Sequence, residues 1–320
     1  MSRFITRVTR LCVLAAAAFT SSFGSAQEYP SKPVTLVVPF AAGSFNDVSA
    51  RVFAKELGKT FGQPFVVENR PGVAAIRQVK AATPNGLTLL WHSSSSTSGQ
   101  ALLAKPDYDF RKDFIPVAKA VQTPLAIFAS TTSGLTSVKS IIDYAKKHPG
   151  KLNYGSAGIG TTTHLNAEIF MKRAGIDMVH IPYKGGSAVY TALMADEIDV
   201  LMYDPAFAAM IKEKGRLLAM LSKNRWSTYK EVPTIEESGG PLVDAVVWTG
   251  MFAPAGTPMA IVAQLNAAIK LAAEAPDVIR YMKTNGYESG WSPQESFQKD
   301  IEVELALWTE VVRFANLPLQ

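Results

Sequence analysis

Short apolar runs alternate with amphipathic segments along most of this chain. The first run, Val34–Pro39, is nearly continuous in apolar residues, as are strands buried on both faces of a parallel sheet. A polar loop at 40–47 and a helical pattern follow, with Asn46 or Asp47 placed to cap the helix. Strands that alternate with helices predict an α/β fold with mainly parallel sheets, in which ligands bind beyond the carboxyl ends of strands.

A second strand, turn and helix start lies at Leu152–Leu165. Its turn has glycines at 155, 158 and 160, and its helix opens on hydroxyl residues. The start of a helix leaves about four backbone N–H groups without intrahelical acceptors and carries roughly half a positive charge, so it suits an anion. Ser156, Thr161 and Thr162 can add hydroxyl donors. The two loops together predict a site for a negatively charged ligand.

Glycine loops also serve other functions. A phosphate-binding P-loop ends in Gly-Lys-Ser/Thr, and this chain has Thr161 in place of the lysine. The dinucleotide pattern G-x-G-x-x-G lacks its third glycine, because Thr163 stands there. A plain helix cap is the simplest alternative, but the comparable loop at 40–47 favours the anion site.

Two further polar positions follow predicted strands. A strand at Leu87–Trp91 leads into a serine-rich loop that contains Ser93. A strand at Ile198–Tyr203 is followed by Asp204. Both positions are therefore expected at the same kind of strand end as the two glycine-containing loops.

Residues 1–26 have the features of a secretory signal peptide. Three arginines precede an apolar run at 11–19, and small residues end the segment, so the mature chain is expected to begin near Gln27. Cys12, the only cysteine, lies in the removed segment. Disulfides, cysteine metal sites and a cysteine nucleophile are therefore excluded from the mature protein.

Charge and length restrict the class of partner and the number of domains. Removal of the signal peptide lowers the formal charge from +5 to +2, because it takes away three arginines and no acidic residue. A charge that small, without a basic run, argues against nucleic acid as a partner. The remaining chain has no other apolar run of about 18 residues, so the mature protein is expected to be soluble. Its length suits one large or two medium domains.

An enzyme is the competing class of protein. The histidines at 92, 148, 164 and 180 form no familiar metal-ligand spacing, and we predict neither a metal site nor a cofactor. Ser156 lacks the first glycine of a nucleophile elbow, since Tyr154 stands there. His164 can act as a general base, but a helix residue hydrogen-bonded for support is favoured because no paired nucleophile and acid can be named.

Seven short motifs follow one another from Tyr29 towards the C-terminus. They are Tyr29-Pro-Ser-Lys-Pro-Val34, the Pro39-Phe40 loop, Glu68-Asn-Arg-Pro-Gly72, Asn153-Tyr-Gly-Ser-Ala-Gly158, His180-Ile-Pro-Tyr-Lys-Gly-Gly186, Val232-Pro-Thr-Ile235 and Phe252-Ala-Pro-Ala-Gly-Thr-Pro258. In these motifs the chain resembles the periplasmic binding proteins of tripartite tricarboxylate transporters, the Bug family. The resemblance implies a periplasmic protein without enzymatic activity that delivers its ligand to separate membrane permease subunits.

The resemblance also implies a two-domain flytrap fold with two crossovers, here near Gln122–Ser130 and Val247–Pro254. The first domain is expected to contain residues 27–125 and 251–320, and the second residues 126–250. The C-terminal helices, one of which opens with a capping box at Ser292–Glu295, are expected to pack on the first domain. The protein is expected to be a monomer. A ligand-sensing partner of a membrane sensor kinase is an alternative, because it would use the same cleft.

The ligand implied by the resemblance is a small carboxylate, such as a di- or tricarboxylate or an aromatic acid, held mostly by backbone amides and ordered water. The expected ligand-binding residues are Phe40, Ala41, Gly43, Ser44, Phe45, Asn46, Ser93, Ser156, Gly160, Thr161, Thr163 and Asp204. Asp204 is expected to hold a water molecule or to fix a loop amide. Capping of a turn before Pro205 is the alternative role.

Two departures from the family pattern concern the ligand. Phe45 stands in a run that is usually glycine-rich, so its ring can stack on an aromatic acid or narrow the cleft, although packing beneath the loop is favoured. Arg77 follows a shortened stretch after Gly72 and can contact the ligand. A solvated helix residue is the simpler interpretation of Arg77.

Overall fold

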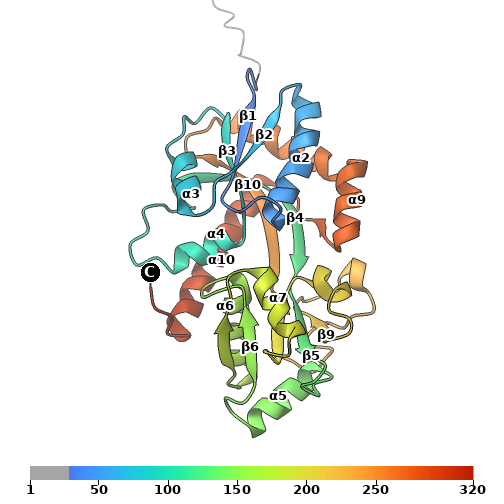
Figure 1. Ribbon diagram of the computed structural model, residues 1–320. Helices are drawn as coiled ribbons and strands as arrows, with labels where there is room; N and C mark the ends of the chain where they lie inside the picture. Colours follow the sequence, from blue (N-terminus) through green and yellow to red (C-terminus); the bar gives the residue numbers. More distant parts are fainter. Residues whose placement is uncertain (1–28, 320) are drawn as a thin grey trace, which may run out of the picture.

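The computed structural model describes residues 29–319 and contains two β-sheets with helices packed around them (Figure 1). The first sheet has the order β11-β4-β10-β3-β1-β2, with β1 (Val34–Val38), β2 (Phe65–Asn69), β3 (Thr88–Ser93), β4 (Phe114–Pro124), β10 (Val246–Pro254) and β11 (Glu288–Ser289). The second sheet has the order β7-β6-β8-β5-β9, with β5 (Ala126–Ser130), β6 (Asn153–Ser156), β7 (Val179–Pro182), β8 (Val200–Tyr203) and β9 (Gly215–Met220).

Helices connect most of these strands. Those in the chain segments of the first sheet are α2 (Phe45–Phe61), α3 (Val73–Lys80), α4 (Ser95–Ala101), α8 (Met259–Ala273), α9 (Pro276–Asn285) and α10 (Gln294–Phe314). Those of the second are α5 (Val138–Lys147), α6 (Thr162–Ala174), α7 (Gly186–Met194) and the short 3₁₀ helices η1 (Pro205–Ala209) and η2 (Ser227–Tyr229). Between residues 29 and 319, no helix combines the length and the apolar character that crossing a bilayer requires.

Each sheet has a parallel core. Strand β1 pairs in parallel with β2 and β3, and β6 pairs in parallel with β7 and β8. The strands that join the sheets and their partners are antiparallel, as in β10 with β3 and β4, and β5 with β8 and β9. The prediction of parallel strands therefore holds for those that lead into the predicted loops, and the crossover strands add the antiparallel pairs.

Two crossovers join the sheets, the first within the predicted range 122–130 and the second just before the predicted range 247–254. Strand β4 ends at Pro124, and β5 begins in the second sheet after the single residue Leu125. The return strand β10 pairs with β4 along its whole length, so it already belongs to the first sheet at Val246. Leu125, Leu221 and Ala245 close a ring of three backbone hydrogen bonds, each 2.8 Å long, at this junction.

The strand register directs the predicted loops towards the junction from both sides. In the first sheet, β1, β3 and β4 run in one direction, and β4 ends where the chain enters the second sheet. In the second sheet, Tyr203 at the end of β8 pairs with Ala126 at the start of β5, and β6 runs parallel to β8. The loops after β1 and β3 therefore face the loops after β6 and β8.

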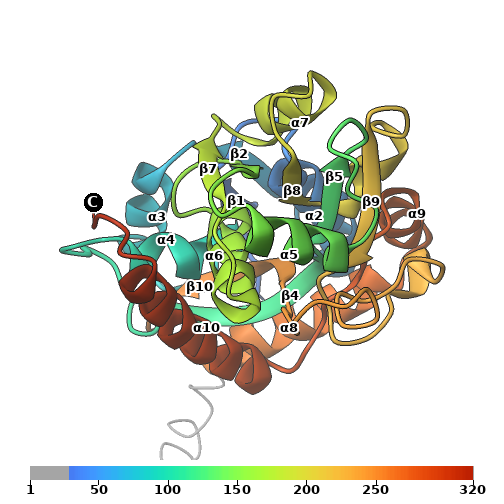
Figure 2. The same cartoon turned by 90° about the horizontal axis from the view of Figure 1, so that it is seen from below.

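Helix α10 packs against both hydrophobic cores. Phe297 and Ile301 in its first half join a core cluster of the first sheet, whereas Trp308 and Val311 in its second half join the largest cluster of the second sheet. Figure 2 shows α10 along one flank of the molecule, beside α4 and α6. The expectation that the C-terminal helices pack on the first domain is therefore wrong for the second half of α10, whose apolar residues continue past the junction.

The predicted capping box at the start of α10 does not form. Pro293 occupies the N-cap position with φ −53° and ψ 149°, and no side chain caps the helix. Ser292 lies one residue too early for its hydroxyl to reach the first helical N–H groups.

Candidate ligand-binding site

The twelve predicted ligand-binding residues lie in four segments at the junction of the two sheets. Residues 40–46 follow β1, and Ser93 ends β3. Residues 156–163 begin at the last residue of β6 and enter α6, and Asp204 follows β8. We call residues 40–47 the first loop and residues 156–163 the second loop.

The first loop ends in a capped helix start. Ser44 is the N-cap of α2, because its Oγ accepts the N–H of Asp47 at 3.3 Å. The predicted cap, Asn46 or Asp47, is therefore wrong, since both residues already lie in the first turn. Gly43 has φ +80°, a conformation that L side chains rarely adopt, and this turn brings Ser44 into the cap position. The N–H groups of Phe45 and Asn46 are the first of the helix and have no intrahelical acceptors.

Asp47 holds the first loop in shape. Its carboxylate accepts hydrogen bonds from Gly43 N at 2.8 Å, Arg51 Nε at 2.9 Å and Asn69 Nδ2 at 2.9 Å. Burial alone would raise the pKa of Asp47, but these hydrogen bonds outweigh it and lower that pKa. Asn69 Nδ2 also donates to the Phe40 carbonyl at 3.2 Å, so the end of β2 supports the start of the loop.

Strand β3 brings Ser93 beside the first loop. The ring of His92 lies edge to face with that of Phe40, with centroids 5.2 Å apart. Nδ1 of His92 accepts the N–H of Ser93 at 2.8 Å, and Ser93 Oγ lies 2.9 Å from Ser95 Oγ. Burial lowers the pKa of His92 to about 3, so this imidazole stays neutral and keeps its acceptor atom. The sequence did not indicate this supporting role of His92.

Several buried polar atoms at this edge of the first sheet have no partner among residues 29–319. They are Asn46 Oδ1 in α2, Ser96 Oγ and Ser98 Oγ in α4, and Thr249 Oγ1 in β10. Thr249 pairs with Ser93 in the sheet register, which places it at the same strand end. A buried polar atom without a partner costs roughly 1 to 3 kcal/mol, so these atoms are suited to bind a polar ligand or ordered water.

The second loop is closed by its own hydroxyl groups. Thr161 is the N-cap of α6, and its Oγ1 donates to the Gly158 carbonyl at 2.7 Å. Thr163 Oγ1 lies 2.9 Å from Thr161 Oγ1 and accepts the Ala157 N–H at 3.1 Å. The first N–H groups of α6, those of Thr162 and Thr163, have no intrahelical acceptors. The hydroxyls therefore shape the turn, and the donors without intrahelical acceptors at this helix start are backbone N–H groups.

Gly160 brings the second loop against α4. Its φ is +75°, and a Cβ atom placed there would lie 1.8 Å from Leu102 Cδ1. Leu102 belongs to the main core cluster of the second sheet although it follows a helix of the first. Glycine is thus required both by the backbone angle and by contact between the two halves of the molecule.

Ser156 is buried behind the second loop. Its Oγ lies 2.7 Å from His180 Nε2, and the Gly158 N–H donates to the same oxygen at 3.1 Å. The sequence suggested no partner for this serine, because His180 lies 24 residues away on β7. His164 is also buried and accepts the Gly160 N–H at its Nδ1, which agrees with the favoured supporting role.

Asp204 connects the two halves of the molecule. Its Oδ1 accepts the Ala206 N–H at 2.9 Å, so it caps η1 at Pro205, which is the alternative role predicted for it. Its Oδ2 accepts the hydroxyl of Tyr287 at 2.8 Å, from the segment between α9 and β11. Burial raises the pKa of Asp204. Phe45 packs on Tyr287 with ring centroids 4.9 Å apart, which agrees with packing beneath the loop.

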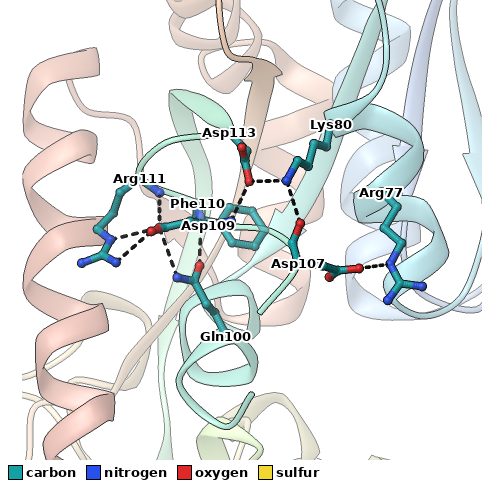
Figure 3. Close-up of polar contacts among 8 residues, drawn as sticks. All are labelled: Arg77, Lys80, Gln100, Asp107, Asp109, Phe110, Arg111 and Asp113. Carbon is teal, nitrogen blue, oxygen red and sulfur yellow. Dashed lines mark hydrogen bonds and ion pairs between the residues drawn. The ribbon is translucent and has the colours of Figure 1, made fainter. Parts of the chain in front are cut away.

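The hydrogen-bond partner of Arg77 is Asp107, a residue outside these loops. Figure 3 shows its guanidinium paired with Asp107, while Lys80 pairs with Asp113 in the same network. The Arg77 side chain is 62% exposed, as expected for a solvated helix residue. The network holds the 103–113 segment beside a cavity of about 720 Å³ whose other wall is α10. None of the twelve predicted residues lines that cavity.

Two sheets joined by crossover strands, with polar loops facing each other at the junction, define a two-domain solute-binding protein, and the predicted fold class is confirmed. The family model described as "Tripartite tricarboxylate transporter family receptor" matches residues 49–317. The chain therefore belongs to this receptor family, and the predicted resemblance is confirmed.

Individual relatives agree with this assignment. Protein BugT of Bordetella pertussis (strain Tohama I) is 32% identical over 306 residues, which cover 92% of this chain and 93% of BugT. The structure of Rpa4515 from R. palustris with adipate is 29% identical with a TM-score of 0.79, over 90% of this chain and 98% of that one. MatC (Rpa3494) from Rhodopseudomonas palustris with bound malate is 29% identical with a TM-score of 0.75, over 89% and 100%. The family and the fold are those of substrate-binding receptors rather than enzymes.

Proposed function

We propose that the protein captures a small carboxylate between the first and second loops. The observation that carries this proposal is the pair of helix starts, α2 and α6, at facing edges of the two sheets. Each start has two N–H groups without intrahelical acceptors, at Phe45 and Asn46 and at Thr162 and Thr163. A ligand with two carboxylates can bind one helix start with each end and so touch both halves of the molecule.

The character of the loops favours hydrogen bonds over ion pairs. Neither loop contains a lysine or arginine. A helix start contributes about 0.3 to 1 kcal/mol to binding an exposed anion and up to about 2 kcal/mol when partly buried. Most of the affinity must therefore come from charge-assisted hydrogen bonds to backbone amides, with Asn46 and Thr249 as further polar groups. Adipate and malate, bound by the two solved relatives, are dicarboxylates of the class that this arrangement fits.

We further propose that the loaded protein delivers its ligand to the membrane subunits of a tripartite tricarboxylate transporter. The supporting observation is membership of the receptor family. Delivery requires export to the periplasm, for which the signal peptide at 1–26 is proposed; this segment lies outside the described residues. We propose that the protein is a monomer with two domains, residues 27–125 with 251–320 and residues 126–250, which close on the ligand.

A proline substitution can test one backbone donor directly. Thr162 is the first helical residue of α6, where proline is tolerated, and Thr161 has φ −69° and ψ 159°, which suit a residue before proline. Thr162→Pro removes one amide donor from the proposed site. Loss of a hydrogen bond to a charged group costs about 1.5 to 3 kcal/mol, so we expect the Kd to rise about 10- to 100-fold.

The measurement is isothermal titration calorimetry with the best acid from a thermal-shift screen that includes malate, adipate, tricarboxylates, aromatic acids and acidic amino acids. Met259→Pro is the matched control, because Met259 is the exposed first residue of α8, after the end of β10 that is farthest from the junction. Stability should be similar in the two variants. Equal affinity of Thr162→Pro and the wild type would refute the role of the α6 amides, and a screen without any stabilising acid would refute carboxylate binding.

A further inference from the structure

Three aromatic rings stack beside the second loop, and a carboxylate contacts them; Tyr154 and His164 are buried, whereas His180 and Glu168 are half-buried. The rings of His164 on α6 and His180 on β7 are nearly parallel, 11° apart, with centroids separated by 3.9 Å. The ring of Tyr154 on β6 continues the stack, 4.8 Å from that of His180. Tyr154 OH donates to Glu168 Oε1 at 2.7 Å, and the same carboxylate lies 3.6 Å from His164 Nε2.

The polar contacts of the His164 ring define its tautomer. The Gly160 N–H donates to Nδ1 at 3.0 Å, so Nδ1 carries a lone pair rather than a proton. Nε2 faces the Glu168 carboxylate and carries the proton of the neutral ring. A second proton on Nδ1 would point at the Gly160 N–H and break this contact. The second loop can therefore keep its observed conformation only with a neutral His164.

We propose that His164 is a positioning residue for the ligand, which holds the second loop in its anion-binding conformation through Gly160 and releases it on acidification. This inference rests on the proposed function, because the first amides of α6 are the groups that Gly160 helps to place. His180, stacked on His164, fixes the plane of the ring. Its Nε2 holds Ser156 at the other end of the same turn, 2.7 Å from Oγ.

The titratable groups around the stack come from α6 itself and from the elements packed against it. Glu168 is the carboxylate that faces it, and Tyr154 donates to that carboxylate. Among the elements packed against α6, α4 contains no titratable side chain, and β8 contributes only Tyr203, which packs on Phe207. Helix α10 carries Glu304, whose half-buried side chain is directed to Trp248 and Thr97, together with Glu295, Lys299, Asp300, Glu302, Glu310 and Arg313. Burial first, and the neighbouring His164 second, lower the pKa of His180 to about 4, so a second positive charge in the stack is disfavoured.

Two substitutions of His164 distinguish the effect of its hydrogen bond to Gly160 from the effect of protonating its imidazole. In His164→Asn the side-chain oxygen can accept the Gly160 N–H from the position of Nδ1 but cannot take up a proton. His164→Ala removes the acceptor altogether. The probes are malate and adipate, and the Kd is measured by calorimetry at pH 8 and at pH 5. We expect the ratio of the Kd at pH 5 to the Kd at pH 8 to be about ten times larger in the wild type than in His164→Asn. His164→Ala should bind weakly at both pH values. Comparison at equal pH cancels the protonation of the probes themselves.

A readout without ligand distinguishes this inference from the proposed function. The Gly160 amide resonance of the ligand-free protein should shift with pH in the wild type and in the control His148→Asn, but not in His164→Asn. His148 is suited as the control because its exposed ring packs on Tyr144 at the end of α5. The inference would be overturned if the Gly160 amide resonance of the wild type did not shift with pH. It would also be overturned if the Kd of the wild type and that of His164→Asn changed equally with pH. Failure of both acids to bind at any pH counts against the proposed function, and the amide resonance then decides the role of His164.

Discussion

Glu304 provides a test of how the two halves of the protein are held together. This residue lies on α10 between Ile301, which belongs to a core cluster of the first sheet, and Trp308, which belongs to the core cluster of the second. Its Oε1 accepts the Trp248 Nε1–H at 2.7 Å. Its Oε2 lies 2.9 Å from Thr97 Oγ1, which also accepts the Trp308 Nε1–H at 3.1 Å and lies 2.8 Å from the Ser94 carbonyl. Burial raises the pKa of Glu304 from its usual 4.5 to about 7, although the hydrogen bonds oppose this change.

The protonated carboxyl satisfies every group in this network. Its O–H can donate to Thr97 Oγ1, and the Thr97 hydroxyl can then donate to the Ser94 carbonyl. Glutamine has the same shape, and its amide can donate to Thr97 while its oxygen accepts from Trp248. Glu304→Gln therefore imitates the neutral acid and removes the titration.

The sign of the effect follows from the raised pKa. Below pH 4.5 the carboxyl is neutral in both the folded and the unfolded chain, and its contribution to stability is fully present. As the pH rises towards 7, the unfolded chain loses this proton while the folded chain retains it, so the free energy of unfolding falls. The difference between 4.5 and about 7 corresponds to about 3 kcal/mol. We expect Glu304→Gln and the wild type to be similarly stable at pH 4.5 and the variant to be up to about 3 kcal/mol more stable at pH 8.

Urea denaturation followed by tryptophan fluorescence between pH 4.5 and pH 8 measures this difference. The matched control is Glu310→Gln, which removes an exposed carboxylate from the same helix. It should shift the pH profile by less than about 0.5 kcal/mol. Parallel profiles for the wild type and Glu304→Gln would show that the carboxyl is not held neutral, and the reasoning from burial would be wrong.

Two further predictions concern contacts between the halves. Gly160→Ala should lower the free energy of unfolding by more than about 1 kcal/mol in urea denaturation and weaken ligand binding in calorimetry. Gly175→Ala is the control, because Gly175 has φ +62° and open space at its Cβ and so gives the cost of the backbone angle alone. Equal losses of stability in the two variants would show that the contact with Leu102 does not contribute. Tyr287→Phe leaves Asp204 Oδ2 without its donor and should lower the free energy of unfolding by about 1 to 3 kcal/mol in urea denaturation. The control Tyr190→Phe removes an exposed hydroxyl and should lower it by less than about 0.5 kcal/mol. Similar losses in the two variants would refute the connecting role of Asp204.

Much of the first loop could be predicted from local pattern. The apolar run before it, the glycine at 43 and the polar residues after it mark a strand, a turn and a helix start, which depend on near neighbours in the chain. The cap was misplaced by two or three residues, because Ser44, Asn46 and Asp47 are all good capping residues. The φ of Gly43 and the bond from Asp47 back to Gly43 decide in favour of Ser44.

The partners of the second loop could not be predicted in this way. Ser156 was expected to face the ligand, but its Oγ is buried against His180, which reaches it through the pairing of β6 with β7. His164 was correctly expected to support the loop, whereas its stacking on His180 depends on the packing of α6 against the sheet. The same limit applies to Tyr287, whose contact with Asp204 joins residues 83 positions apart.

The sequence by itself determined the α/β class, the strands before the two glycine-containing loops and the two helix starts after them, because hydrophobic period, glycine and capping residues act over a few neighbouring positions. Only the tertiary structure decided that the two helix starts face each other and that α10 packs against both hydrophobic cores. It also decided which hydroxyls and imidazoles support the loops. These features depend on strand register and on contacts between residues far apart in the chain, and local side-chain chemistry does not specify them.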